Sequence, residues 1–309
     1  GQAQLNSIEL NAAHESFKRA IEREPNVTEY WLSIARALVG AGDREYAKKT
    51  IADAYAENPA DEQLSVLLTT TLLANNELDS AMAVAKELRN AQPDSVVPIY
   101  LEAEVLAKKG NVSEAAAFYD EVLAIENKPQ YVARAYQLRD AAGRSDKRDP
   151  LIRYLEQNPL NSTIRNFLAQ GYQVDGESEI AIREYQQVLE VVPDDHIALN
   201  NLAWMYLESG DERAEEFGRK AYAVAPDDAN VVDTLGWILV QKDKVQEGLD
   251  LLQPLADQNP DRLVFQYHVA AALAKLGKSG EARQILESVL RDGGNFTGRD
   301  AAEELLLQL

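Results

Sequence analysis

One pattern of large apolar and small side chains recurs along the chain with helical spacing. Ile34 is followed directly by the small Ala35 and, three residues later, by the apolar Leu38. Residues spaced i, i+3 and i+4 share one face of an α-helix. The same pattern returns at Leu68, Thr69 and Leu72, at Leu168, Ala169 and Tyr172, at Leu202, Ala203 and Tyr206, at Leu235, Gly236 and Leu239, and at Val269, Ala270 and Leu273. It predicts a series of helices that pack closely through this face.

Proline marks the junctions between these helices. It recurs with a period of 33 or 34 residues over much of the chain, at Pro25, Pro59, Pro93, Pro159, Pro193, Pro226 and Pro260. A helix rarely tolerates an interior proline, so each one is interpreted as the end of one helix pair and the start of the next. Inside each pair, a left-handed turn is predicted at Gly42, Asn76, Gly110, Gly176, Gly210, Asp243 and Gly277.

The expected organisation is one array over residues 1–309. Full units are expected at 26–59, 60–93, 94–129, 160–193, 194–226, 227–260 and 261–294. The irregular unit 130–159 is shortened, because a charged loop at 143–150 replaces the start of its second helix; it is either a tolerated irregularity or a bend in the array. Residues 1–25 fit a unit truncated at its amino end, and 295–309 fit a capping helix with Ala302, Leu305 and Leu306 on its apolar face.

The residues of the first complete unit resemble a known repeat family. The series Trp31, Ile34, Ala35, Leu38, Ala47, Ile51, Ala54 and Pro59 resembles the tetratricopeptide (TPR) consensus almost position for position. The resemblance implies an all-α fold, a right-handed α-solenoid of stacked helix-turn-helix units, with Trp31 in the core. It also implies a non-enzymatic scaffold for protein–protein interaction, without naming the partner.

Composition narrows the possible functions. The chain has 31 Lys and Arg against 51 Asp and Glu, a formal charge of −20, which disfavours binding to nucleic acid. It has no cysteine, and no apolar run is long enough for a membrane-spanning helix. The three histidines, His14, His196 and His268, lie in different units without metal-ligand spacing. With no catalytic or phosphate-binding motif, no enzymatic activity, metal or cofactor is expected.

The candidate binding surface follows from the family resemblance, which implies that first helices line a concave groove. Positions seven and eleven after each proline are expected to face it, and the repeats from 160 onward carry amides, a carboxylate and aromatic rings there. These residues are Asn166, Gln170, Asn200, Trp204, Asp233, Trp237 and Tyr267. Such side chains suit an extended peptide or a glycan. Alternatively, Trp204 and Trp237 pack in the core.

A narrower resemblance concerns the last third of the chain. Residues 200–211, 233–240 and 267–275 resemble the TPR proteins of bacterial exosortase (PEP-CTERM) exopolysaccharide systems. This resemblance implies a periplasmic or cell-envelope scaffold associated with exopolysaccharide export and protein sorting. Two alternatives remain open: a cytoplasmic co-chaperone adaptor, which would need more basic residues in the groove, and an architectural spacer without a ligand.

Overall fold

The computed structural model describes residues 44–291 and 296–309, and every regular element within these ranges is an α-helix. The prediction of an all-α fold is therefore confirmed. The expected unit 1–25, most of the unit 26–59 and the core position Trp31 lie outside the described residues. The chain divides into two compact units, unit 1 up to Tyr154 and unit 2 from Leu155, which are described separately.

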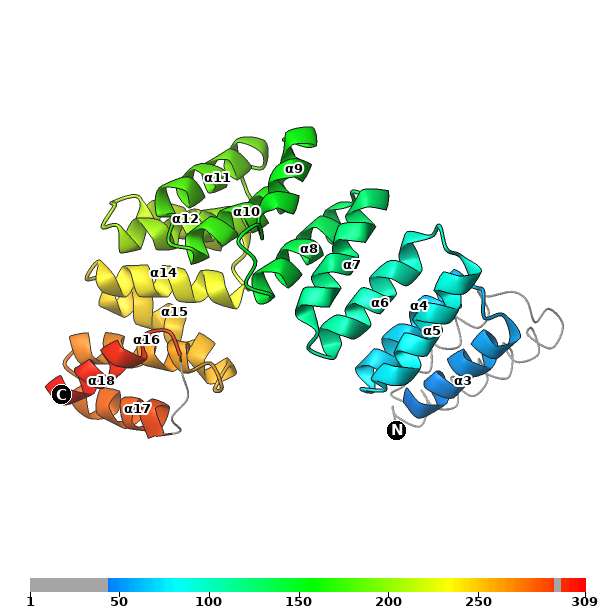
Figure 1. Cartoon of the computed structure of the whole chain (residues 1–309). Helices are drawn as coiled ribbons and strands as arrows, with labels where there is room; N and C mark the ends of the chain where they lie inside the picture. The colour runs from blue at the N-terminus through cyan, green and yellow to red at the C-terminus, as the bar shows by residue number, and fades with distance from the viewer. Residues whose placement is uncertain (1–43, 292–295) are drawn as a thin grey trace. The chain divides into compact units, whose positions relative to one another are not determined.

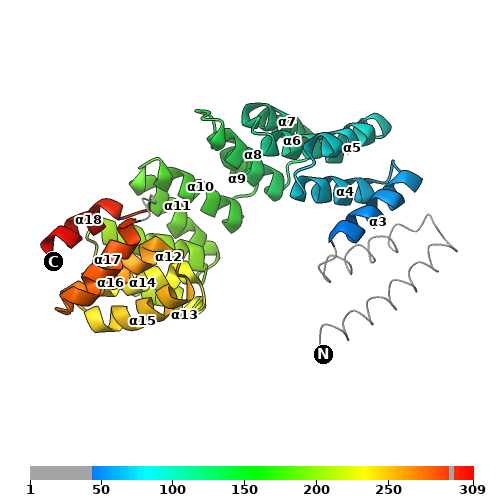
Figure 2. The same cartoon turned by 90° about the horizontal axis from the view of Figure 1, so that it is seen from below.

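Within the described residues, unit 1 contains the second helix of one pair, two complete pairs and the first helix of the next pair (Figures 1 and 2). Its helices are α3 (Arg44–Glu57), α4 (Glu62–Ala74), α5 (Leu78–Ala91), α6 (Val96–Lys108), α7 (Val112–Ile125) and α8 (Pro129–Ala141). Helix α9 (Asp149–Gln157) crosses the boundary between the units. Each helix from α3 to α8 packs against the next, and the first helices α4 and α6 also touch.

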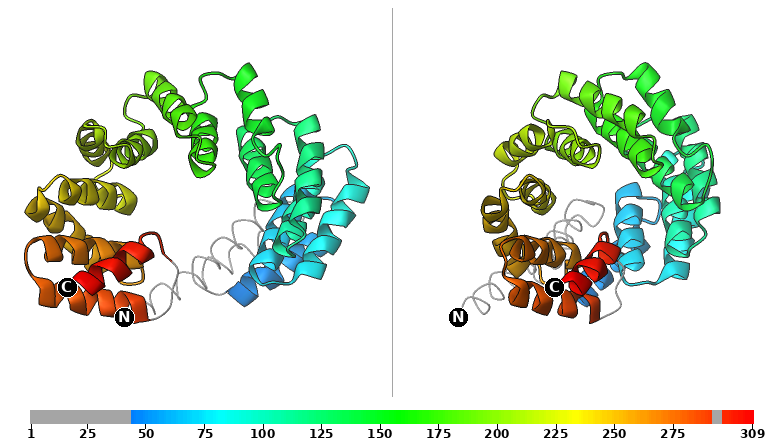
Figure 3. Two further views of the ribbon diagram at one scale, coloured as in Figure 1. Left: turned by 60° about the vertical axis from the view of Figure 1, so that its left-hand side comes forward. Right: turned by 90° about the vertical axis from the view of Figure 1, so that its left-hand side faces the viewer.

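Unit 2 continues the alternation of first and second helices. It contains α10 (Ser162–Val174), α11 (Ser178–Val191), α12 (His196–Glu208), α13 (Ala214–Val224), α14 (Ala229–Gln241), α15 (Val245–Gln258), α16 (Leu263–Lys275), α17 (Ser279–Arg291) and α18 (Arg299–Gln308). Among the first helices, α12 contacts α14 and α14 contacts α16. The helix pairs therefore stack in sequence order, as Figure 3 shows.

The turns inside the pairs have the predicted left-handed backbone. Positive φ occurs at Gly110, Gly176, Gly210 and Gly277, and also at the non-glycine residues Asn76 (φ 61°) and Asp243 (φ 58°). Asparagine and aspartate tolerate this conformation better than other side chains. The prediction from sequence is confirmed at each of these positions.

Carboxylates and amides after the prolines begin the first helices. Asp61, Asn161 and Asp195 each accept a hydrogen bond from the backbone N–H three residues later, and Asp228 accepts from the N–H groups of Asn230 and Val231. These groups would otherwise lack partners at a helix start. The acidic side chains are therefore helix caps.

Small residues allow the two helices of a pair to approach closely. In unit 2, Ala169, Ala181, Ala203 and Ala214 are fully buried in one apolar cluster with Tyr185 and Tyr206. A Cβ atom on Gly236 of α14 would lie 2.6 Å from Cγ of Leu252 on α15. This distance is too short for a side chain, so the glycine permits the α14–α15 contact.

The shortened unit is held by a network of charged side chains. Arg139, which is buried, donates to Asp120 at 2.6 Å and to the backbone oxygen of Asp146 at 3.0 Å. Arg144 donates to Asp146 at 2.7 Å and to Asp120 at 3.1 Å. These bonds fasten the loop between α8 and α9 to α7, all within unit 1.

Helix α18 covers the end of the last helix pair, against α16 and α17 (Figures 1 and 3). Ala302 is fully buried, Leu305 and Leu306 are half-buried, and Glu303 and Glu304 are exposed. The predicted amphipathic helix at this position is confirmed.

Candidate functional site

A pocket of about 160 Å³ opens between the first helices α10 and α12 of unit 2. Its lining combines amides, apolar side chains and one carboxylate: Thr163, Asn166, Phe167, Gln170, Tyr185, Asp195, Ile197 and Asn201. Two of the predicted groove residues, Asn166 and Gln170, are among them. We refer to this site as the inner pocket.

Asn166 forms the polar wall of the inner pocket. Its Nδ2 donates to both carboxylate oxygens of Asp195, at 3.2 and 3.1 Å, while Asp195 also accepts from the N–H of Ala198 as the cap of α12. Asn166 is only 8% exposed, and its Oδ1 is buried without a partner in the described part of the chain. A buried acceptor without a donor costs roughly 1–3 kcal/mol, so a donor that reaches this oxygen would be favoured.

The other walls are largely apolar. Ile197, on the first turn of α12, is 47% exposed and borders the pocket, and Phe167 of α10 is half-buried. Tyr185 reaches the pocket from α11 and donates its hydroxyl to Gln173 at 2.9 Å. The inner pocket therefore offers apolar contact beside amide groups, and its volume suits a single side chain.

Asn200 and Trp204 lie one turn apart on α12, beyond the lining of the inner pocket. Both are half-buried, and Asn200 has a buried Oδ1 without a partner among the described residues, as Asn166 does. Trp204 makes no ring contact with another aromatic side chain in the described ranges.

Asp233, Trp237 and Tyr267 belong to a packed cluster instead of the inner pocket. Asp233 and His268 are both buried, and their Oδ1 and Nδ1 atoms are 2.7 Å apart. The Trp237 ring stacks on His268, with centroids 4.1 Å apart and planes 14° apart. Tyr267 is 8% exposed and is covered by Phe296, with ring centroids 6.4 Å apart, and by Gly298. Only Trp237 of the three is half-exposed.

Sequence reasoning missed six of the eight residues that line the inner pocket. Thr163 and Ile197 lie four residues after a proline, and Phe167 and Asn201 lie eight after one, whereas positions seven and eleven were expected to face the groove. Positions four, eight and eleven share one helical face through i, i+3 and i+4 spacing. The apolar Ile197 and Phe167 beside amides were the available signal.

On α6 of unit 1, the side chains at the corresponding positions contact neighbouring side chains. Glu104 of α6 accepts from both Nε and Nη2 of Arg134, at 2.8 and 2.7 Å, and from the Tyr119 hydroxyl at 2.7 Å. Tyr100 packs against Tyr131 with ring centroids 5.6 Å apart, and burial together with nearby acidic groups raises the pKa of Tyr100 to about 12. The carboxylate of Glu104 therefore has its hydrogen-bond partners within unit 1.

No group of three His, Asp or Glu side chains in the described ranges is arranged to hold a metal ion. None of the helices between residues 44 and 309 that the structure describes is long and apolar enough to cross a bilayer.

Known proteins resemble this chain in sequence and in fold. Residues 168–229 match the tetratricopeptide repeat family model. TPR repeat-containing protein PA4667 of Pseudomonas aeruginosa is 26% identical over 203 residues, a match that covers 62% of this chain and 34% of that protein. The chain thus spans about a third of the length of this curated relative.

Two solved structures share the fold. The first, of the APC/C hetero-tetramer Cut9-Hcn1, aligns with 95% of this chain and 58% of its own, at a TM-score of 0.60 and 15% identity. The second, a tetratricopeptide repeat protein from Parabacteroides merdae, aligns with 84% of this chain and 99% of its own, at a TM-score of 0.57 and 16% identity. At these identities the likeness concerns the fold alone. The sequence match is therefore to the tetratricopeptide repeat over residues 168–229, and the feature shared with the two solved structures is the all-α solenoid fold.

Proposed function

We propose that the chain is a non-enzymatic scaffold that binds an extended segment of a protein partner on the first helices of unit 2. The inner pocket would take one apolar side chain, and the amides around it would bond to the peptide backbone. The observation that carries the proposal is an open pocket with an exposed aliphatic side chain, Ile197, beside the unpartnered acceptor of Asn166.

The energetics favour a peptide ligand of this kind. Burying one aliphatic side chain contributes about 1.5–3 kcal/mol. Peptide N–H groups donate hydrogen bonds, and the Oδ1 atoms of Asn166 and Asn200 have no donor among the described residues. Two further predicted groove residues, Gln170 and Trp204, lie one turn further along α10 and α12, and we propose that they extend the contact.

The co-chaperone alternative is less well supported. Gripping an acidic peptide terminus requires Lys or Arg, yet the charged group in the lining of the inner pocket is the carboxylate of Asp195. A neutral or basic ligand segment fits this electrostatic environment better.

The proposal is tested by blocking the pocket. A random twelve-residue peptide display library is selected on the intact chain, and the enriched peptides are measured by fluorescence anisotropy against the Ile197→Arg variant. Because the pocket would lose an apolar wall and gain a long charged side chain, we expect binding to weaken about tenfold or more.

Val224→Arg is the matched control, since Val224 is a comparably exposed aliphatic residue, at 42% against 47%, on α13 outside the pocket. Its binding should equal that of the unsubstituted chain, and both variants should keep the same thermal midpoint. Equal binding by Ile197→Arg, or a library that enriches no sequence, would reject the inner pocket as the site.

A location in the periplasm or cell envelope and a role beside exopolysaccharide export and protein sorting remain part of the proposal. They rest on the sequence resemblance at residues 200–211, 233–240 and 267–275. The same resemblance leaves a glycan as a second ligand class for the groove. Adding oligosaccharides to the anisotropy assay tests this class directly, because a glycan ligand would displace the bound peptide.

A further inference from the structure

Ion pairs bridge several of the seams between consecutive second helices. In unit 2, Arg219 of α13 donates to Glu247 of α15 at 2.7 Å, and Lys244 at the start of α15 donates to Glu215 of α13 at 2.5 Å. In unit 1, α3 and α5 are joined by Lys48 with Glu77, and α5 and α7 by Arg89 with Glu121. In each of these pairs, both the cation and the anion are residues of this chain.

The seam between α15 and α17 has the anion of such a pair without the cation. Glu281 of α17 lies 34 residues after Glu247, and Gln253 of α15 lies 34 residues after Arg219. The position that supplies a guanidinium to the preceding seam therefore carries a neutral amide here. No ion pair joins α15 to α17 among the residues that the structure describes.

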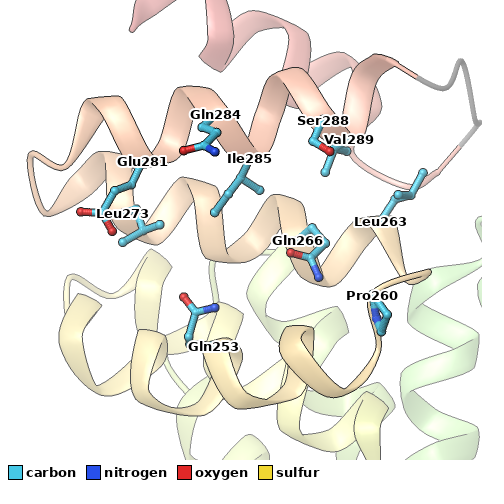
Figure 4. A pocket seen from close by; sticks show the side chains of 10 residues that line it. All are labelled: Gln253, Pro260, Leu263, Gln266, Leu273, Glu281, Gln284, Ile285, Ser288 and Val289. Atoms are coloured by element: carbon cyan, nitrogen blue, oxygen red, sulfur yellow. The ribbon is translucent and has the colours of Figure 1, made fainter.

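A groove of about 580 Å³ occupies this seam, with α16 as its floor (Figure 4). We call it the outer groove. Glu281 and Leu273 lie at one end, and Pro260, Leu263 and Val289 lie at the other (Figure 4). Leu263 and Leu273 are ten residues apart on α16, which corresponds to roughly 15 Å along a helix. An extended chain covers that distance in about four or five residues.

The outer groove offers several hydrogen-bond acceptors beside the amide of Gln284 and the hydroxyl of Ser288. Gln253 uses its amide nitrogen on Asp257 at 2.9 Å, and Gln266 uses its own on the backbone oxygen of Ala256 at 2.9 Å. Their carbonyl oxygens remain as acceptors, together with the carboxylate of Glu281. A ligand rich in donors and positively charged at this end complements the groove, and arginine has both properties.

We propose that the outer groove binds a segment of a protein partner that carries an arginine and, four or five residues away, an aliphatic side chain. The arginine pairs with Glu281 in the way Arg219 pairs with Glu247, and the aliphatic side chain contacts Leu263 and Val289. The formal charge of −20 favours the approach of a basic segment. This site lies on other helices than the inner pocket and does not depend on it.

The test restores the missing ion pair within the chain. The Gln253→Arg variant would place a guanidinium opposite Glu281 and close the groove. A random hexapeptide display library is first depleted on Gln253→Arg and then selected on the unsubstituted chain, so that enriched peptides require an open groove. We expect these peptides to carry arginine and an aliphatic residue four or five positions apart.

Affinities of the enriched peptides are then measured by fluorescence anisotropy. Binding should be lost in Gln253→Arg and should weaken about fivefold in Glu281→Gln, the effect of removing one exposed ion pair. The matched controls are Gln258→Arg, at the end of α15, and Glu287→Gln, on α17, which make the same charge changes at exposed positions outside the groove. Both should bind as the unsubstituted chain does.

Three outcomes overturn the proposal: no peptide is enriched after depletion, the enriched peptides lack arginine, or they bind Gln253→Arg unchanged. The Ile197→Arg variant separates this result from the inner pocket, because it should bind outer-groove peptides normally. Thermal midpoints of all variants identify any loss of binding that is caused by unfolding.

Discussion

At the residue scale, the two tryptophans of unit 2 have different surroundings. Trp237 stacks on His268 and also lies 5.7 Å from the Tyr267 ring, whereas Trp204 has no aromatic neighbour among the described residues. The sequence motifs around them, Leu-Ala-Trp and Leu-Gly-Trp, are nearly the same. The difference comes from the next first helix, because α16 places His268 and Tyr267 beside Trp237.

This difference predicts unequal effects on stability. Trp237→Phe should lower the free energy of unfolding by about 1–2 kcal/mol, since it shrinks a ring in a stacked cluster. Trp204→Phe should change it by less than about 0.5 kcal/mol. Urea unfolding followed by circular dichroism measures both. Equal losses would mean that Trp204 is as tightly packed as Trp237.

The same comparison shows what the sequence could predict about the site. Counting residues from the prolines identified Asn166 and Gln170, which line the inner pocket, but the same counting also selected Asp233 and Tyr267, which are buried. The register of a helix face follows from periodicity. Whether a position on that face is exposed depends on the helices that pack over it, and here His268 and α18 cover the face. The periodicity of one helix cannot predict such a contact.

At the element scale, the loop between α8 and α9 depends on ionised carboxylates. Hydrogen bonds from Arg144 lower the pKa of Asp146 from 3.8 to about 2. A carboxyl group whose pKa is depressed in the folded state stabilises that state above its unfolded pKa and loses this contribution as the pH falls through the folded pKa. The loop should therefore loosen between pH 3.8 and about 2.

Arg144→Gln should return the pKa of Asp146 towards its ordinary value. Carbon-detected NMR titration of the side-chain carboxyl groups measures this change. Asp211 is an internal control, because Arg213 lowers its pKa to about 2 in the same way but in unit 2. If Asp146 still titrates near pH 2 in the Arg144→Gln variant, Arg144 is not the cause of the lowered pKa.

The sequence predicted this element well in outline. The shortened unit, its charged loop and the short helix after it were all expected near their observed bounds, because proline, glycine and the charged run mark them. The buried Arg139 at the centre of the network was not expected. Its partners Asp120 and Asp146 are separated from it by 19 and 7 residues, and only folding of α7 against α8 brings them together.

At the scale of the whole molecule, contacts run between neighbouring helices, so damage should remain local within a unit. Ala302→Asp would place a carboxylate in the buried cluster of Tyr267, Ala271 and Leu286. We expect α18 to detach, at a cost of at least about 2 kcal/mol. Hydrogen exchange should then accelerate in α16 and α17 while α10 and α11 keep their protection.

Ala301→Asp is the control for this experiment, because Ala301 is exposed on the same helix. It should leave exchange unchanged throughout unit 2. Faster exchange of α10 and α11 in Ala302→Asp would mean that unit 2 unfolds as one cooperative body.

The ion pairs between α13 and α15 differ in kind from the contacts inside the core. Charged pairs such as Arg219 with Glu247 join these two second helices, whereas the cluster around Tyr185 and Tyr206 is built of buried apolar and small residues from first and second helices. Dissolved salt screens exposed charges but hardly weakens apolar contacts. Raising the ionic strength should therefore loosen the joint between α13 and α15 while the apolar cores keep their contacts.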